Sequence, residues 1–183
     1  MTDLRAGDRH EYKVFNDEVL YAEDSLVKVD RATIQFLKDK ARDNERQRIR
    51  LCAHQDVQHP LHEMLIVHAH ETYVRPHKHL RCESFHVIEG AADVVLFDDA
   101  GQMSDVIRLG DYASGHTFYY RLREPLFHTV IVRSEIVVFH ETKQGPFVPS
   151  ETTFASWAPD GDEAAQRAFV EDLTQAVGRF LCR

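Results

Sequence analysis

The chain has few of the features that would assign a protein to a broad class at once. Its three cysteines, Cys52, Cys82 and Cys182, are odd in number and widely spread, which excludes the disulfide framework of a small secreted domain. No apolar run approaches the ~18–20 residues needed to span a bilayer, so we expect no membrane association. The first twelve residues lack the basic and then apolar pattern of a signal peptide, so we expect a cytoplasmic protein.

An excess of positive charge is also missing. The 22 lysines and arginines are outnumbered by 30 aspartates and glutamates, and the net charge is −8 with histidine neutral. This balance argues against nucleic acid as a partner. Hydrophobic residues make up 43% of the 183 residues, which is enough for a core and indicates a single domain. The abundant residue is histidine, with 12 copies, many of them between His54 and His79.

The chain divides into three parts by pattern. Residues 1–48 predict a loose arm over 1–18, two short strands within Val19–Val29, and a helix over Arg31–Glu45 capped by Asp30. Residues 49–148 predict a run of short strands separated by turn signals, which is typical of a β-sandwich or barrel. Residues 149–183 predict an ordered loop and then an amphipathic helix. The predicted strands are His62–His70, Glu83–Glu89, Ala91–Phe97, Met103–Leu109, Tyr112–Tyr120, Thr129–Arg133 and Ile136–Thr142.

The stretch from Pro76 to Gly90 reads PHKHLRCESFHVIEG and predicts a metal site. Alternate side chains of a strand share a face, so His77 and His79 can point the same way. Glu83 shares its face with Phe85 and Val87, and a carboxylate on an apolar face needs a partner because a lone buried charge is costly. A cation held by His77, His79 and Glu83 supplies that partner, and this ligand set suits Fe²⁺, Mn²⁺, Ni²⁺ or Zn²⁺. A polar strand end without a metal is the alternative.

At these residues the sequence resembles the cupin superfamily. The spacing His77-x-His79-xxx-Glu83-xxxxxx-Gly90 matches the first cupin motif, and His128 stands where the second motif supplies another histidine. Glu71 replaces a frequent glycine of the first motif, and the Pro-x-Gly before the second-motif histidine is replaced by Arg123 and Pro125. The resemblance implies an all-β fold, the cupin double-stranded β-helix, with one helix before and one after. It also implies His128 as a fourth metal ligand, and a homodimer.

A narrower resemblance is to the WbuC-type cupin metalloproteins, and it covers about residues 25–160. It is carried by RIRLCAH, HEMLI, YVRPHKH, FHETKQGPF and WAP, which begin at Arg48, His62, Tyr73, Phe139 and Trp157. This family is usually found among genes for surface-polysaccharide (O-antigen) biosynthesis. The resemblance therefore implies a small sugar or sugar-nucleotide as the partner, without fixing the reaction.

Further residues are candidates for the chemistry. We expect Glu141 as a general base, with a structural ion pair as the alternative, and Tyr120 as a phenol for acid–base work. The candidate substrate-binding residues are Arg50, Arg75 and Lys143, which can hold an anionic group, and His54, which belongs to the narrower resemblance. A metal-dependent isomerase or epimerase is the expected activity. An Fe²⁺-dependent dioxygenase and a non-catalytic sugar-binding module are the alternatives.

Overall fold

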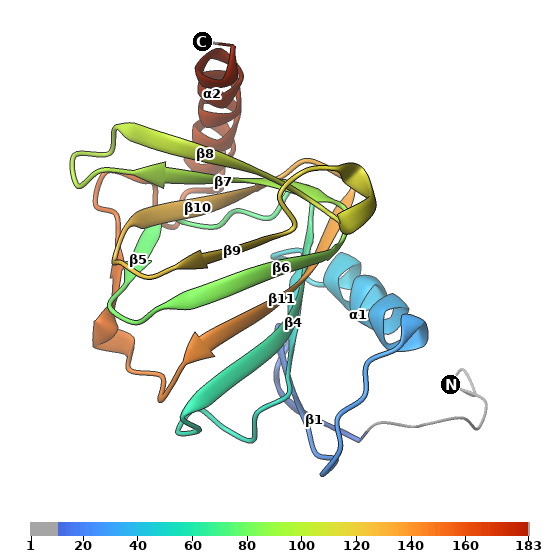
Figure 1. The fold of residues 1–183 in the computed structure, drawn as a ribbon. Coiled ribbons are helices and arrows are strands. Elements are labelled where there is room, and N and C mark those ends of the chain that lie inside the picture. Colours follow the sequence, from blue (N-terminus) through green and yellow to red (C-terminus); the bar gives the residue numbers. More distant parts are fainter. Residues whose placement is uncertain (1–10, 183) are drawn as a thin grey trace.

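The computed structural model describes residues 11–182, which form two β-sheets and two α-helices (Figure 1). The first half of the chain holds β1 (Tyr12–Asn16), β2 (Val19–Ala22), α1 (Arg31–Asp43), β3 (Arg48–Cys52), β4 (Leu61–Ala69), β5 (His77–His79), β6 (Glu83–Glu89) and β7 (Ala91–Phe97). The second half holds β8 (Met103–Gly110), β9 (Tyr119–Leu122), β10 (Phe127–Val132), β11 (Ile136–Gln144), β12 (Thr152–Phe154) and α2 (Glu163–Leu181), with single 3₁₀ turns at Tyr112–Ser114 and Pro149–Glu151.

Two sheets make up the barrel walls. Within residues 11–182 the larger sheet has seven strands in the order β1-β2-β3-β4-β11-β6-β9, and the smaller has five in the order β12-β5-β10-β7-β8. Strands β2 and β3 are parallel, and the other neighbouring strands are antiparallel. The chain crosses between the sheets at Gly90, whose φ is +85° and where a Cβ atom would lie 2.2 Å from the carbonyl oxygen of Ile136. Only glycine satisfies both conditions there.

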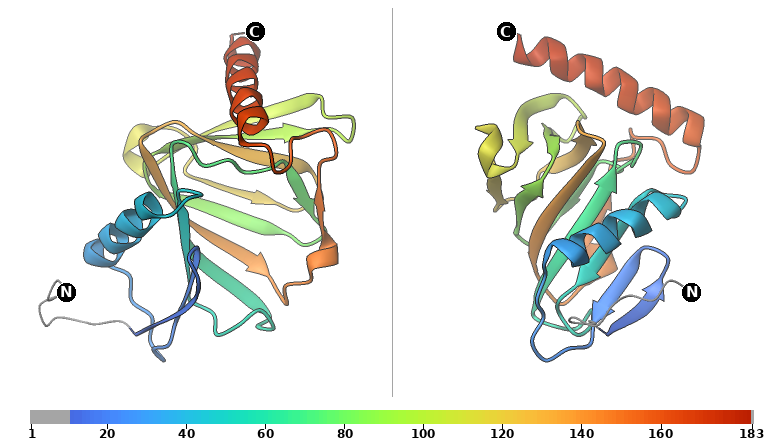
Figure 2. Two further views of the ribbon diagram at one scale, coloured as in Figure 1. Left: turned by 180° about the vertical axis from the view of Figure 1, so that it is seen from behind. Right: turned by 90° about the vertical axis from the view of Figure 1, so that its right-hand side faces the viewer.

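The apolar residues form three layers. One layer lies between the two sheets and includes Phe85, Phe139 and Val94. A second lies between the seven-stranded sheet and α1, where Leu37 is 0% exposed. The third lies between the five-stranded sheet and α2, where Leu173 and Val177 are buried. Figure 2 shows the two helices on the outside of different sheets. The predicted fold class, an all-β barrel with a flanking N-terminal helix and a C-terminal helix, is therefore confirmed.

Both helices form where local sequence signals predict them. The Asp30 carboxylate accepts a hydrogen bond from the backbone N–H of Thr33 at 2.8 Å and so caps α1. Ile34, Leu37 and Ala41 face the seven-stranded sheet, as their helical spacing predicts. In α2, the side chain of Asp162 accepts hydrogen bonds from two backbone amides of the first turn.

Two predictions about local structure were wrong. Residues 112–120 do not form one strand, because the Asp111 side chain caps a 3₁₀ turn that ends at Gly115 with φ of 76°, and β9 begins only at Tyr119. Within Val19–Val29 only β2 is a strand. Its hairpin partner is β1, which lies in the predicted arm. Four of the five residues of β1 are exposed, Val14 and Phe15 among them. The first ten residues of that predicted arm lie outside the described residues.

Candidate metal centre

The four predicted ligands come from three strands and from both sheets. His77 and His79 lie on β5, and His128 on β10 is paired directly with His77 in the five-stranded sheet. Glu83 is the first residue of β6 in the facing seven-stranded sheet. The candidate centre therefore bridges the two sheets, at the end of the barrel where β5 and β6 meet (Figure 1). We call this end the mouth.

The side-chain atoms of these residues converge. One ring nitrogen from each of His77, His79 and His128 lies within 4.8 Å of the other two. The Glu83 carboxylate lies 2.9 Å from Nε2 of His128 and 3.5 Å from Nε2 of His79. Both His128 and Glu83 are buried, with side chains 4% and 6% exposed. Three imidazoles thus converge, and the Glu83 carboxylate lies beside two of them.

Hydrogen bonds at Nδ1 orient the three histidine rings so that their Nε2 atoms can bind a cation. Nδ1 of His77 lies 2.8 Å from the Arg75 carbonyl oxygen, and Nδ1 of His128 lies 3.0 Å from the Leu126 carbonyl oxygen. Nδ1 of His79 lies 3.0 Å from Oγ1 of Thr152 on β12. When Nδ1–H donates to these oxygens, Nε2 keeps its lone pair and can bind a metal. The donor set and the outer hydrogen bonds both fit a divalent transition metal.

Electrostatics favours the ligating forms of His77, His79 and Glu83. For His128, burial by itself would lower the pKa, but the hydrogen bond and charge of Glu83 raise it. Burial lowers the pKa of His77 to about 4, and burial together with the Lys143 ammonium lowers the pKa of His79 to about 3. Both imidazoles are therefore neutral near pH 7. Burial by itself would raise the pKa of the Glu83 carboxyl, but the hydrogen bond and charge of His128 with the Lys143 charge lower it to about 2. The carboxylate is ionised and available to a cation.

Three of the other predicted site residues share the inner face of the seven-stranded sheet. Lys143 is paired with Glu83 across β11 and β6, and its Nζ lies 3.8 Å from the Glu83 carboxylate. Glu141 is paired with Phe85, which is paired in turn with Tyr120 on β9. Burial and the Glu83 charge raise the pKa of Glu141 to about 7. Burial and the same carboxylates raise the pKa of Tyr120 well above its ordinary value, so its phenol stays protonated.

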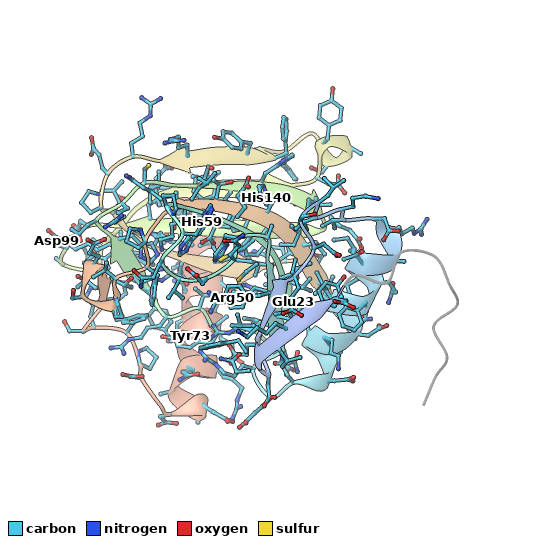
Figure 3. The ribbon with its side chains drawn as sticks, turned by 90° about the horizontal axis from the view of Figure 1, so that it is seen from below. Glu23, Arg50, His59, Tyr73, Asp99 and His140 are labelled. Carbon is cyan, nitrogen blue, oxygen red and sulfur yellow. The ribbon has the colours of Figure 1, made fainter. Side chains whose placement is uncertain are left out.

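Arg50 also points into the barrel. Its neighbours Ile49 and Leu51 pack under α1, whereas Cys52, two residues along β3, belongs to the interior layer. In Figure 3 Arg50 lies towards the middle of the molecule, while Asp99 lies at the edge. Arg50 is paired with Ile66 of β4, which is paired in turn with Phe139 of β11. Phe139 is one inward-facing position farther from the mouth than Glu141, so Arg50 lies deeper in the barrel than Glu141.

Two predicted substrate-binding residues lie elsewhere. The Arg75 guanidinium pairs with Asp160, donates to the carbonyl oxygen of Ala155 at 3.1 Å, and lies 5.4 Å from the ring centroid of Phe154. Only its carbonyl, which holds His77, serves the centre. His54 stacks on His62 with ring centroids 4.1 Å apart and lines a separate hollow of about 530 Å³ near the β1–β2 hairpin.

Sequence reasoning missed two residues near the centre. Thr152 holds His79, but nothing in the sequence indicated that β12 would pair with β5. His62 is 6% exposed and lies beside Lys143 across β4 and β11. It lines a small hollow of about 20 Å³ together with His79 and Lys143. Its shared face with Met64 and Ile66, both interior, was the available signal.

The comparisons with known proteins concern the fold. A family model described as "Domain of unknown function (DUF6016)" matches residues 29–109. No curated protein matches the chain in sequence. Similar solved structures include a variant of Bacillus subtilis oxalate decarboxylase, with 19% identity over 60% of this chain and 28% of that chain, and a TM-score of 0.44.

Two further solved structures are similar. A variant of salicylate 1,2-dioxygenase from Pseudoaminobacter salicylatoxidans has 13% identity over 60% of this chain and 29% of that chain, with a TM-score of 0.44. A protein from Shewanella oneidensis has 10% identity over 56% of this chain and 66% of that chain, with a TM-score of 0.46. The chain thus spans less than two thirds of each of these proteins. The decarboxylase and the dioxygenase have the cupin fold.

Neither α1 nor α2, the helices of residues 11–182, is long and apolar enough to cross a membrane.

Proposed function

We propose that the chain is a metal-dependent enzyme, of the WbuC type, that isomerises or epimerises a sugar or sugar-nucleotide of surface-polysaccharide biosynthesis. The observation that carries the proposal is the convergence of three Nδ1-anchored imidazoles and one ionised carboxylate beside a carboxyl group, Glu141, whose pKa is raised to about 7. His77, His79, Glu83 and His128 would hold the metal. A metal bound there acts as a Lewis acid on a substrate oxygen.

The surrounding residues have complementary roles in the proposal. Glu141 takes a proton from carbon, because a base whose pKa lies near the working pH is the most effective. Tyr120 lies across Phe85 from Glu141 and offers an O–H donor at neutral pH. Lys143 and Arg50 hold negative charge on the substrate. The homodimer and the cytoplasmic location expected from the sequence belong to the same proposal.

The first experiment is elemental analysis of the protein purified without an affinity tag. We expect about one equivalent of iron, manganese, nickel or zinc, and its loss in the His77→Ala/His79→Ala double variant. His86→Ala is the matched control, because His86 lies in the same region but is exposed on the outer face of β6. Absence of metal from the wild-type protein, even after reloading, would contradict the proposal.

The reaction class is tested next on the metal-loaded protein. Incubation with nucleotide sugars and sugar phosphates should give an isomer or epimer of one of them, detected by NMR. Oxygen uptake that depends on Fe²⁺ and an added substrate would instead assign a dioxygenase. Ligand-induced thermal stabilisation without turnover would assign a binding module.

A further inference from the structure

The connection between β11 and β12 lies beside the metal centre. Strand β11 ends at Gln144 and β12 begins at Thr152, so residues 145–151 form this connection, which we call the mouth loop. In Figure 1 it is the orange segment that runs from the tip of β11 past β5. The loop borders the side of the centre at which His79 lies, because Thr152 pairs with His79 across β12 and β5.

A small hollow borders both the metal centre and the mouth loop. It is lined by the ligand His79 and by Lys143, and also by Pro146, Phe147 and Glu151 of the loop. Its volume is about 20 Å³. A hollow of this size admits a water molecule, whereas pockets for small organic ligands have roughly 300–1,000 Å³. A sugar can therefore reach the ligands from this side only after the mouth loop has moved.

Apolar burial does little to hold the mouth loop in place. Within residues 11–182 none of the three apolar layers includes a residue of the loop, and Phe147 is 47% exposed. The chain enters an apolar layer again only at Ala155. The backbone amides of Gly145 and Phe147 donate to the carbonyl oxygens of Pro60 and Val57, which are exposed residues of the β3–β4 connection. Segments held in this way open at low free energy while the rest of the domain stays folded.

One side chain fastens both ends of the mouth loop. Arg81 lies in the β5–β6 connection, between the ligands His79 and Glu83. Its Nε and Nη2 donate to the Glu151 carboxylate at 2.5 and 3.1 Å, and its Nη1 donates to the carbonyl oxygen of Gly145. Gly145 and Glu151 are the first and last residues of the loop. A planar guanidinium with several donors can make these contacts at the same time, which an ammonium cannot.

The position of the loop leaves a buried polar group of its neighbour unpaired. His62 is 6% exposed, and among residues 11–182 its Nε2 has no hydrogen-bond partner. Gly145 lies against this ring, since a Cβ atom on Gly145 would be 2.8 Å from Nε2 of His62. A buried nitrogen without a partner costs free energy, and a hydrogen bond to water removes this cost once the loop moves away. The contacts of Arg81 hold the loop closed against this cost.

We propose that the mouth loop is a gate over the metal centre and that Arg81 keeps the gate closed. This inference rests on the proposed function, because the gate gives the proposed substrate its path to the metal ligands. When the bonds from Arg81 to Gly145 and Glu151 break, the loop moves away and the side of the centre at His79 and Lys143 opens. When they form again, the loop shields the centre from bulk water.

The test follows the exchange of the metal itself, because a hydrated ion needs the same path and no substrate has to be known. Release of Zn²⁺ from the loaded protein to a chromogenic chelator, and uptake of Zn²⁺ by the metal-free protein, are measured by stopped flow. Arg81→Gln should speed up both by about tenfold, because charge-assisted bonds that hold the gate closed are lost. The dissociation constant should stay near the wild-type value, because both rates change together.

The signs of two effects separate a gate from an influence of charge on the metal. Arg81→Gln removes a positive charge near the bound cation, and Glu151→Gln removes a negative one. Charge alone would therefore change the release rate in opposite directions. A gate makes release and uptake faster in both variants. The double variant should be no faster than Arg81→Gln, because the two residues act through one shared contact.

Lys78→Gln is the matched control. Lys78 lies on β5 between the ligands His77 and His79, but its Nζ pairs with Asp99 at 2.6 Å and not with the mouth loop. The substitution removes the same charge as Arg81→Gln and leaves the gate closed. Exchange of Zn²⁺ should therefore not become faster in Lys78→Gln.

Two outcomes would overturn the gate. One is exchange at the wild-type rate in both Arg81→Gln and Glu151→Gln. The other is a weaker affinity of Arg81→Gln with an unchanged rate of uptake, which would mean that Arg81 only supports His79 through Thr152. Both leave the metal centre itself intact. A wild-type protein that takes up no Zn²⁺, Fe²⁺, Mn²⁺ or Ni²⁺ would instead overturn the proposed function.

Discussion

The two faces of the seven-stranded sheet are both covered, yet they differ in composition. The outer face, under α1, is apolar and includes Leu51, Leu65 and Val67. The inner face mixes Phe139 and Met64 with the ionisable side chains of Glu141, Lys143 and Arg50. Burying charged groups costs free energy unless they are paired, whereas burying apolar groups stabilises the fold. The outer face therefore holds the protein together, and the inner face gives up stability to position reactive groups.

The largest effect we predict is a loss of stability without a loss of metal binding, caused by a substitution in α1. Leu37 is 0% exposed and packs on the outer face. Leu37→Ala should lower the free energy of unfolding by about 2–5 kcal/mol, from lost apolar burial and the cavity left behind. The folded variant should still bind metal as the wild-type protein does, measured by elemental analysis below its melting temperature. Loss of metal from folded Leu37→Ala would show that the faces are coupled and would break the comparison.

The second prediction concerns the mouth, where a substitution should lower metal affinity. Thr152→Val keeps the shape of the side chain but removes the hydroxyl that lies 3.0 Å from Nδ1 of His79. Metal affinity, measured by competition with a chelator, should fall by about 10–100-fold, as is typical when the outer partner of a metal-ligating histidine is lost. Thr152→Ser keeps the hydroxyl and should bind metal as the wild-type protein does. Unchanged affinity in Thr152→Val would remove Thr152 from the centre.

Leu37 and Thr152 also show what the sequence could and could not predict. Leu37 was predictable, because helical spacing and the Asp30 cap are local signals, and the spacing of His77, His79 and Glu83 is equally local. Thr152 was not, because β12 reaches β5 only through a pairing between segments about 70 residues apart. The same kind of long-range contact determines where the Arg75 side chain lies, because its guanidinium pairs with Asp160.

The last prediction concerns the stability that is lost by burying a titratable residue, His68, on the inner face. His68 is buried on the inner face, with its ring centroid 5.2 Å from that of Phe139, and its Nδ1 has no hydrogen-bond partner among residues 11–182. Burial, with smaller contributions from Arg48 and Arg50, lowers its pKa from 6.5 to about 3. The folded protein therefore keeps His68 neutral while the unfolded chain takes up a proton as the pH falls below the unfolded pKa. Stability is present above that pKa and is lost progressively as the pH falls towards 3.

The size of this loss can be compared with a variant that cannot titrate. Between pH 7 and pH 5 the single site should cost about 2 kcal/mol of unfolding free energy. In His68→Leu that part of the pH dependence should disappear, which urea unfolding at the two pH values would measure. Val67→Ala, on the outer face beside it, should lower stability equally at both pH values, because Val67 is 0% exposed and carries no titrating group. If His68→Leu kept the full pH dependence, the acid sensitivity would belong to other groups, and the inner face would not carry the cost assigned to His68.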